Sequence, residues 1–394
     1  MRPPATPPAP VSQLTTYELG DLQRRRSIKW REFAPDVLPM RIAEMDTPLA
    51  APIADALTRA IAGGDTGYAT AGRLPESYAA FAGRRYGWHP DPATMRLVPD
   101  VMAGIVEVLR VVTTPGDRIV VNTPGYPPYF SWLERIGRRI IPSPLAADAD
   151  GYRLDLDRLT RDFASGARAY LLCNPHNPTG AAFSEDDLRA VAALAARHGV
   201  RVISDEILAP LTYPGTRHVP FPSLDTAAAA RSIALASASK AWNLAGLKAA
   251  LAVPGSDAHT VTASIHDEVE ESAGLFGVLA SEAAFDHGEP WLDHLITTLD
   301  HNRRLLVTLL DRQLPGIRHH PPQAGYVAWL NCRALALPDD PAQFFLDHGR
   351  VGLSSGPRFG PADDPDHAAS GFVRLNFATS PDLVTEAVRR MTIR

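Results

Sequence analysis

The chain has 394 residues, of which 45% are hydrophobic and 21% charged, with a formal net charge of −5 at pH 7. A chain of this length can bury a large core and is expected to form two domains. Its slightly acidic balance argues against a nucleic-acid partner, and the absence of a long apolar stretch argues against a membrane span. Composition and charge alone do not identify a function.

The N-terminal sequence MRPPATPPAP is rich in proline and has no apolar segment. It is typical of a flexible lead-in, which we place at 1–19, and not of a secretory signal. The two cysteines, Cys173 and Cys332, each stand in an apolar setting and are expected to be reduced core residues of a cytoplasmic protein. The histidine pair at 319–320 lacks a ligand pattern around it, so no metal site is expected.

Helical and strand patterns alternate from about Pro48 onward. The first two helical patterns are PLAAPIADALTRAIAG and PESYAAFAGRRYG, which should stop at their terminal glycines. A third, AGIVEVLRVVT, precedes the strand pattern PGDRIVVN. The clearest helix is SEDDLRAVAALAARHG, with Ser184 as N-cap and Gly199 past its end. Further buried-strand patterns are RRIIPSPL, ARAYLLCN, VRVISD and RSIALAS.

This alternation predicts an α/β fold with a mostly parallel sheet covered by helices. A long helix is expected around HGEPWLDHL, and the strands GYVAWLNC and FVRLNFA after it indicate a smaller α+β domain. We place the boundary near residue 285, with a large domain over 48–285 and a small domain over 286–394. In such sheets, ligands bind at the carboxyl ends of the strands.

Chemically useful residues stand where the predicted strands end. LLCNPHNPTG contains Asn177, VISDE contains Asp205, NTPGYPPY contains Tyr126, and SASKAWNLAGLK contains Lys240. A lone lysine is most simply a surface residue whose charged end reaches water. A lysine against a core is costly while charged, and as a free amine it can attack a carbonyl to form a Schiff base.

This combination matches the needs of pyridoxal 5'-phosphate (PLP). PLP needs a lysine for its aldehyde, an aromatic face over its ring, a carboxylate at its pyridinium nitrogen and a donor near its phenolic oxygen. Its phosphate favours a helix N-terminus, and Ala103 and Gly104 in DVMAGIVEVL are expected to open such a helix. We therefore predict that Lys240 binds PLP covalently.

The chain resembles the fold-type I PLP enzymes, aminotransferase class I/II, over nearly its whole length. The resemblance rests on the motifs Asn-Pro-x-Asn-Pro-Thr-Gly, Ser-Asp-Glu and Ser-x-Ser-Lys in this order. Within that superfamily, PMRIAEMD, TGYATAG, SASKAWNLAGLK and GFVRLNFAT are similar to the cystathionine β-lyase-like C–S lyases. The resemblance implies the PLP-dependent transferase fold type I, with an N-terminal arm over 20–47 that packs with the small domain.

The resemblance also implies roles in cofactor binding. Lys240 would form the Schiff base and shuttle the substrate Cα proton, and Asp205 would keep the pyridinium nitrogen protonated. Asn177 would hydrogen-bond the phenolic oxygen, and Tyr126 would stack on the ring. The residues expected around the phosphate are Ala103, Gly104, Ser237, Ser239 and Lys248.

In the same family pattern, Arg374 would clamp the substrate α-carboxylate bidentately, which suits guanidinium geometry. Asn177 and Thr47 would also lie near the substrate. Tyr68, the tyrosine of TGYATAG, would reach the phosphate of the partner subunit. The resemblance thus implies a homodimer with shared active sites.

The chain departs from the family pattern at several positions. Leu208 stands where relatives have His or Tyr and cannot hydrogen-bond the phenolic oxygen, which should raise the pKa of the Schiff base. Arg41 and Thr47 stand where the subgroup commonly has Trp and Phe, so the substrate is expected to differ from simple cystathionine. The acidic cluster within 268–271 is expected to be a solvated helix face or, alternatively, to meet a polar or cationic substrate.

We expect a C–S β-lyase that cleaves an S-substituted L-cysteine to a thiol, pyruvate and ammonia by α,β-elimination. One alternative is an aminotransferase, or a relative that decarboxylates or oxidatively deaminates an amino acid in a specialised biosynthetic pathway. Another is a regulator that keeps the fold but has lost catalysis. The set Lys240, Asp205, Asn177 and Arg374 argues against the regulator.

Overall fold

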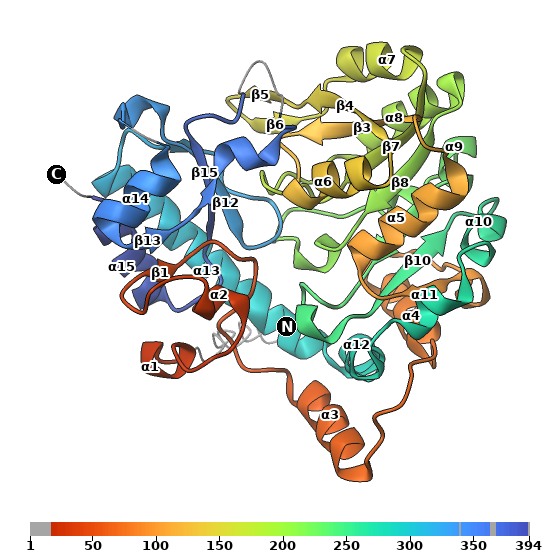
Figure 1. Ribbon diagram of the computed structural model, residues 1–394, viewed down its shortest axis with the longest axis horizontal. Helices are drawn as coiled ribbons and strands as arrows, with labels where there is room; N and C mark the ends of the chain where they lie inside the picture. Colours follow the sequence, from red (N-terminus) through yellow and green to blue (C-terminus); the bar gives the residue numbers. More distant parts are fainter. Residues whose placement is uncertain (1–16, 339, 363–367, 393–394) are drawn as a thin grey trace, which may run out of the picture.

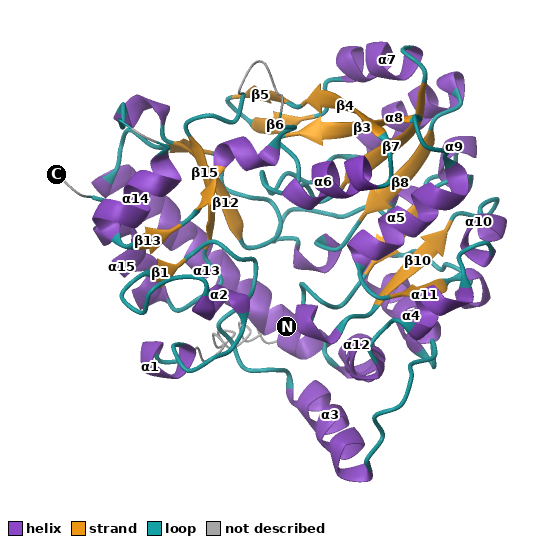
Figure 2. Ribbon diagram, in the orientation of Figure 1, coloured by secondary structure: helices purple, strands orange, loops and turns teal. Residues whose placement is uncertain are grey.

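The computed structural model describes residues 17–338, 340–362 and 368–392 and divides them between a large lobe and a small lobe (Figure 1). The large lobe contains a seven-stranded sheet and the small lobe a four-stranded sheet. Figure 2 shows helices on both sides of the larger sheet. The predicted α/β fold is confirmed, and the predicted lead-in at 1–19 lies mostly outside the described residues.

The larger sheet is parallel except for one strand. β10 runs antiparallel to both of its neighbours, β9 and β2, and every other pair is parallel. Sequence analysis missed β10 and β2. In spatial order the strands are β2 (Arg96–Val98), β10 (Ala250–Pro254), β9 (Ile233–Ala236), β8 (Arg201–Asp205), β7 (Ala167–Cys173), β3 (Arg118–Thr123) and β4 (Arg139–Pro144).

Alternate side chains of these strands enter two separate cores. Ile119 and Leu171 pack with helices α5 and α6, whereas Val120 and Tyr170 pack with α7 and α8 on the opposite face. The helices of the large lobe are α3 (Ala51–Gly63), α4 (Leu74–Tyr86), α5 (Val101–Val112), α6 (Pro127–Arg135), α7 (Leu156–Ala164), α8 (Glu185–His198), α9 (Ala227–Ala230), α10 (His259–Ala263), α11 (Asp267–Glu271) and α12 (Leu275–His287).

Helix α8 has the end signals that its sequence predicts. The Ser184 hydroxyl accepts from the Asp187 N–H, and the Asp187 carboxylate accepts from the Ser184 N–H, which forms a capping box. Gly199 ends the helix at φ 67°, a left-handed conformation that glycine adopts without a Cβ clash. This helix is therefore confirmed at both ends.

The small lobe is built on an antiparallel sheet of β11 (Arg318–His319), β12 (Val327–Asn331), β15 (Phe372–Asn376) and β14 (Ser354–Ser355). Its helices are α13 (Glu289–Gln313), α14 (Pro341–Gly349) and α15 (Pro381–Met391), and α15 packs along α13. The boundary that we predicted near residue 285 falls in the last turn of α12.

The N-terminal arm joins the small lobe through a strand pair. After α1 (Leu19–Leu22) and α2 (Ile28–Arg31), strand β1 (Leu38–Pro39) pairs in parallel with β13 (Val351–Gly352). The arm is anchored by Asp46, whose buried carboxylate accepts from Lys29 Nζ at 2.8 Å and from Trp30 Nε1 at 2.9 Å. These bonds fix the path of residues 41–45 toward the large lobe.

The remaining elements are short. They are the hairpin β5 (Ala146–Asp148) and β6 (Gly151–Arg153), and the 3-10 turns η1 (Pro92–Thr94), η2 (Ala209–Leu211), η3 (Phe221–Ser223), η4 (Ala245–Leu247), η5 (Arg333–Leu335) and η6 (Gly356–Phe359). Within the described ranges, the structure contains no helix that is both long and apolar enough to span a membrane.

Candidate active site

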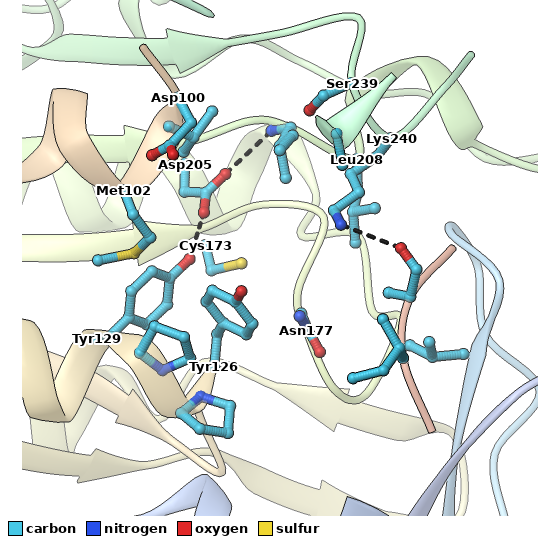
Figure 3. A pocket seen from close by; sticks show the side chains of 18 of the residues that line it. Asp100, Met102, Tyr126, Tyr129, Cys173, Asn177, Asp205, Leu208, Ser239 and Lys240 are labelled. Atoms are coloured by element: carbon cyan, nitrogen blue, oxygen red, sulfur yellow. Dashed lines mark hydrogen bonds between the residues drawn. The ribbon is translucent and has the colours of Figure 1, made fainter. Parts of the chain in front are cut away.

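A cavity of about 400 Å³ lies where the arm, the carboxyl ends of the large sheet and the small lobe meet (Figure 3). The sequence-predicted residues that line it are Tyr126, Asn177, Asp205, Ser239, Lys240, Lys248 and Arg374. Residues from positions 126 to 374 thus come together at one site. This edge of the sheet is where an open α/β fold places its ligands.

Lys240 projects into this cavity from the loop that follows β9. Ser237 holds the loop, because its hydroxyl donates to the Ala249 carbonyl at 2.7 Å and accepts from the Ser239 N–H at 3.1 Å. The Lys240 Nζ donates to the carbonyl of Ala43 in the arm at 3.1 Å (Figure 3). Burial, followed by the charge of Arg374, lowers the pKa of Lys240 to about 8. Roughly one tenth of this amine is therefore unprotonated at pH 7, far more than for an exposed lysine.

Asp205, at the end of β8, is a buried carboxylate with two hydrogen-bond donors. The Tyr129 hydroxyl donates to Oδ2, and the Ile207 N–H donates to Oδ1 at 3.1 Å (Figure 3). Burial raises the pKa of Asp205 to about 6, although both hydrogen bonds oppose that rise by favouring the anion. At neutral pH the cavity therefore contains a buried negative charge.

Arg374, on β15, is a buried cation without a carboxylate partner in the described part of the chain. Its Nη1 donates to Asn177 Oδ1 at 3.0 Å and its Nη2 to the Arg41 carbonyl at 3.1 Å, while its buried Nε has no partner there. Burial lowers the pKa of Arg374 to about 10. A buried guanidinium with an unused donor is suited to receive an anion.

The N-terminus of α5 forms another wall, but it starts earlier than the sequence suggested. The helix begins at Val101, and both Val101 and Met102 line the cavity. The N–H of Ala103 donates to the Asp100 carboxylate at 2.8 Å, and Gly104 packs against β9, where a Cβ would come within 2.5 Å of Leu235. Ala103 and Gly104 do not line the cavity, so their contact with a phosphate stays a prediction.

Ser239 and Lys248 line the cavity together with the start of α5. Lys248 Nζ forms an ion pair with Asp100 at 2.8 Å. The first N–H groups of a helix lack partners within the helix and carry partial positive charge. This part of the cavity therefore offers amides, a hydroxyl and an ammonium group to an anion.

Three other predicted residues lie outside the cavity lining. Ser237 supports the lysine loop through the hydrogen bonds of its hydroxyl with Ala249 and Ser239, and its contact with a phosphate stays a prediction. Thr47 is buried next to Asp46 in the arm and does not line the cavity. Tyr68 is 89% exposed and is likewise outside the cavity of its own chain.

The departures seen in the sequence have distinct positions. Leu208 and Arg41 both line the cavity. In the acidic cluster on α11, Glu270 accepts from the Ala71 N–H at 3.1 Å and pairs with Arg96 at 3.2 Å. Glu270 is therefore tied to the segment that follows Tyr68 and is not only a solvated residue.

Sequence reasoning missed several residues that shape the site. Tyr129, which donates to Asp205, lies one helical turn after Tyr126. The two rings meet edge to face, with their centroids 5.4 Å apart. Tyr326 donates its hydroxyl to the Ala43 carbonyl that also accepts from Lys240. The ring of Phe359 lies 5.1 Å from the Arg374 guanidinium carbon.

A sequence model described as "Aminotransferase class I and II" matches residues 36–391. The chain belongs to this family.

The most informative relatives share nearly the full length of the chain. A Mycobacterium tuberculosis protein provisionally named a cystathionine β-lyase is 46% identical, with 98% of each chain covered. The cystathionine β-lyase of Corynebacterium glutamicum is 34% identical over 95% of this chain and 98% of the relative. A solved structure from Corynebacterium diphtheriae, described provisionally as a PLP-dependent β-cystathionase, matches with a TM-score of 0.90 and 32% identity, covering 96% of this chain and 98% of that one.

The residues in the cavity fit PLP. The chemistry needs a lysine amine, a buried carboxylate, an aromatic face and a cationic cradle for the phosphate. Lys240, Asp205 and Tyr126 supply the first three, and Lys248 with the start of α5 supplies the fourth. The unpaired Nε of Arg374 remains for a substrate anion.

We expect that Asp205→Asn makes the cofactor-free protein more stable above pH 6. The pKa of the Asp205 carboxyl rises from 3.8 in the unfolded chain to about 6 in the folded protein. Below pH 3.8 the carboxyl is neutral in both states and does not oppose folding. As pH rises through 6, the free energy of unfolding falls to its lower level because the buried carboxyl becomes charged. Above pH 6, a pKa shift of this size lowers the free energy of unfolding by roughly 3 kcal/mol. Urea unfolding of both proteins at pH 5 and pH 8 measures the gain, which should be larger at pH 8.

Asp46→Asn is the matched control for this prediction. Asp46 is also a buried carboxylate, but it pairs with the buried Lys29 ammonium. Its replacement leaves a buried cation unpaired and should destabilise the protein. Loss of stability at pH 8 in Asp205→Asn, as we expect for Asp46→Asn, would contradict the interpretation that the Asp205 carboxylate destabilises the cofactor-free protein and serves ligand binding.

Proposed function

We propose that this protein is a PLP-dependent C–S β-lyase that converts an S-substituted L-cysteine and water to a thiol, pyruvate and ammonia. The observation that carries the proposal is the placement of Arg374, with a buried unused donor, in the same cavity as a lysine of lowered pKa. The first group suits the α-carboxylate of an amino acid, and the second suits proton transfer at its α-carbon. The names of the full-length relatives support the same reaction.

Seven groups of this chain would hold the cofactor. Lys240 would bind the aldehyde carbon, Asp205 the ring nitrogen and Tyr126 the ring face, while Asn177 would donate to the phenolic oxygen. Ser239, Lys248 and the start of α5 bind its phosphate. When bound, PLP supplies an electron-withdrawing ring that accepts the electron pair left at the substrate α-carbon.

Arg374 would then orient the substrate, and Lys240 would remove its α-proton. Arg374 binds the α-carboxylate and fixes the orientation of the Cα–H bond, so that this bond breaks in preference to the bond to the carboxylate. Lys240 takes the α-proton as a general base, and its lowered pKa of about 8 suits that role near neutral pH. The β-carbon then expels the thiolate, and hydrolysis of the remaining enamine yields pyruvate and ammonia.

Elimination is tested by omitting any keto acid acceptor. The purified enzyme with PLP is mixed with a panel of S-substituted L-cysteines, and thiol and pyruvate are measured by mass spectrometry. We expect equimolar thiol and pyruvate from at least one conjugate and none from L-alanine, which lacks a leaving group. Turnover that requires a keto acid would instead identify an aminotransferase, and release of carbon dioxide would identify a decarboxylase.

We also propose a homodimer in which Tyr68 reaches the phosphate site of the partner. Tyr68 is 89% exposed and stands outside the cavity of its own chain, which supports this role. We further propose a cytoplasmic location, supported by Cys173 and Cys332, which are buried and unpaired with each other.

Shared sites predict complementation between two inactive variants. Lys240→Ala and Tyr68→Ala subunits that exchange at random should recover about one quarter of wild-type activity, because half of the dimers then contain one unmutated site. Size-exclusion chromatography with light scattering verifies the dimer, and differently tagged subunits verify exchange. No recovery after confirmed exchange, or a fully active monomer, would contradict the shared site.

A further inference from the structure

Two hydrogen-bond donors share one backbone carbonyl beside the lysine of the cavity. Lys240 Nζ donates to the Ala43 carbonyl at 3.1 Å, and the Tyr326 hydroxyl donates to the same oxygen at 3.1 Å. A carbonyl oxygen has two lone pairs, so these two bonds use its full capacity. Tyr326 also lines the cavity, although the proposed reaction assigns it no role.

The Ala43 carbonyl is held in place independently of Lys240. It belongs to the arm segment 41–45, whose neighbouring carbonyls are bound by a residue of β15. Asn376 Nδ2 donates to the Ile42 carbonyl at 2.6 Å and to the Glu44 carbonyl at 2.8 Å. The position of the Ala43 carbonyl is therefore fixed from both sides along the chain.

The lysine loop is tied to the same segment of the arm. Asn243 lies three residues after Lys240. Its side chain accepts from the Met45 N–H at 2.9 Å and donates to the Met45 carbonyl at 2.9 Å. Asn243 has φ 60°, in the left-handed region that asparagine adopts more readily than most residues. The separation between the lysine loop and the arm is thus set by a side chain other than Lys240.

Tyr326 is also firmly anchored. Its own carbonyl accepts from the Phe377 N–H at 3.0 Å, next to the pairing of β12 with β15, and its side chain is 2% exposed. Burial raises the pKa of Tyr326, so the hydroxyl stays protonated. Because a carbonyl has no proton to give, the hydroxyl hydrogen points at the oxygen that Lys240 also uses.

This sharing affects Lys240 because its amine changes charge. An ammonium group donates more strongly than a neutral amine, so a strong acceptor nearby favours the charged form. The Tyr326 hydroxyl weakens the Ala43 carbonyl as an acceptor and places its own partly positive hydrogen near the amine. Both effects disfavour the ammonium form and leave a neutral amine, whose lone pair can accept a proton.

We propose that Tyr326 is a positioning residue, which keeps the Lys240 amine neutral by sharing the Ala43 carbonyl with it. Its importance for proton transfer rests on the proposed function, in which Lys240 takes the α-proton. The effect on the free amine concerns this chain alone and can be tested without turnover. The charged groups that act on Lys240 come from other segments and stay in place when Tyr326 is replaced. They are Glu44, Asp205, Lys248 and Arg374.

Tyr326→Phe removes the hydroxyl and keeps the ring. Trace acetylation of the cofactor-free full chain, followed by peptide mass spectrometry, gives the rate of Lys240 modification at each pH. The midpoint of this profile is the pKa of the amine. We expect the midpoint to rise by about half a pH unit or more, because the Ala43 carbonyl then accepts from the ammonium alone. Water that enters the space of the hydroxyl would solvate the ammonium and act in the same direction.

Tyr213→Phe is the matched control. Tyr213 is also 2% exposed and also donates its hydroxyl to a backbone carbonyl, that of Gly325, but it does not line the cavity. The same group is thus removed from a similar environment. The midpoint for Lys240 should stay unchanged in this variant.

Asn243→Gly separates the hydroxyl from the general rigidity of the arm. Glycine retains the left-handed backbone at φ 60°, while both bonds to Met45 are lost. The arm is loosened, but the Ala43 carbonyl still has both of its donors. The midpoint should therefore not rise.

The holoenzyme provides a second measurement. Exchange of the α-proton of L-alanine in D2O, followed by NMR, reports proton transfer without a leaving group. At pH 7, Tyr326→Phe should exchange this proton about threefold more slowly than wild type, and the difference should shrink at pH 9, where the amine is mostly neutral in both proteins. Equal slowing at both pH values would show that the hydroxyl only supports packing, and overturns the proposal.

The labelling results decide between the positioning role and the reaction separately. A raised midpoint in Tyr326→Phe alone supports the positioning role. An unchanged or lowered midpoint overturns it, as does a rise of the same size in Tyr213→Phe or Asn243→Gly. A raised midpoint without pyruvate from any cysteine conjugate supports the positioning role while the proposed reaction fails. Pyruvate formation with an unchanged midpoint overturns the positioning role and leaves the reaction standing.

Discussion

Lys240→Ala is expected to reduce turnover by at least about a thousandfold, because the amine that binds the cofactor and carries the α-proton is lost. The protein should still bind PLP, since Lys248, Ser239 and the start of α5 remain in place. Borohydride reduction followed by peptide mass spectrometry measures the covalent link. Wild type should yield a PLP adduct on Lys240, and the variant should yield none.

Lys248→Ala is the matched control, because it removes the other lysine of the cavity. Lys248 is ion-paired with Asp100 and has a side chain that is 55% exposed. Its loss should weaken PLP affinity but leave the reducible adduct on Lys240. An adduct on Lys248 in wild type, or a reducible adduct that persists in Lys240→Ala, would contradict the assignment.

Arg374→Gln is expected to lower kcat/KM for an S-substituted cysteine by about a hundredfold or more. Without the guanidinium, the substrate binds less tightly and its Cα–H bond is no longer held in the orientation that reacts. The matching conjugate of cysteamine has no α-carboxylate. Its slow conversion should therefore be nearly the same in wild type and variant. Steady-state kinetics with this pair of substrates separates loss of carboxylate binding from general damage to the site.

Arg138 is the control for this prediction, because it is a buried arginine that does not line the cavity. It is 7% exposed, like a core residue, and its donors are taken up by Thr113 and by the carbonyl of Leu109. Arg138→Gln should lower the free energy of unfolding and leave KM unchanged. If Arg374→Gln instead destabilised the protein without affecting KM, Arg374 would be a structural residue like Arg138.

Local sequence signals were sufficient for much of the fold. Helix α8 could be predicted at both ends because its cap at Ser184 and its stop at Gly199 depend on neighbouring residues alone. Strand β10 was missed although it is a short, fully buried apolar run like the predicted strand β9, so the lack of periodicity does not distinguish the two. Its antiparallel direction follows from tertiary pairing with β9 and β2, which the local pattern does not encode.

The site shows the same division between local and distant information. Asp205, Asn177 and Lys240 follow strands whose carboxyl ends meet, so their convergence could be inferred from the fold class. Ala103 and Gly104 were misplaced because the helix start at Val101 depends on the cap made by Asp100. The contact between Lys240 and Ala43 joins residues 197 positions apart and could not be read from either segment.

Segments that are far apart in the sequence meet at this cavity, and this has a consequence for biosynthesis. Arg374 leaves the ribosome 333 residues after Arg41, whose carbonyl it contacts. Strand β1 likewise cannot form its strand pair until β13 has been synthesised. Because such non-local contacts form late in folding, a nascent or prematurely terminated chain lacks the complete pocket. A chain that stops before β15 therefore lacks the Arg374 guanidinium of the cavity.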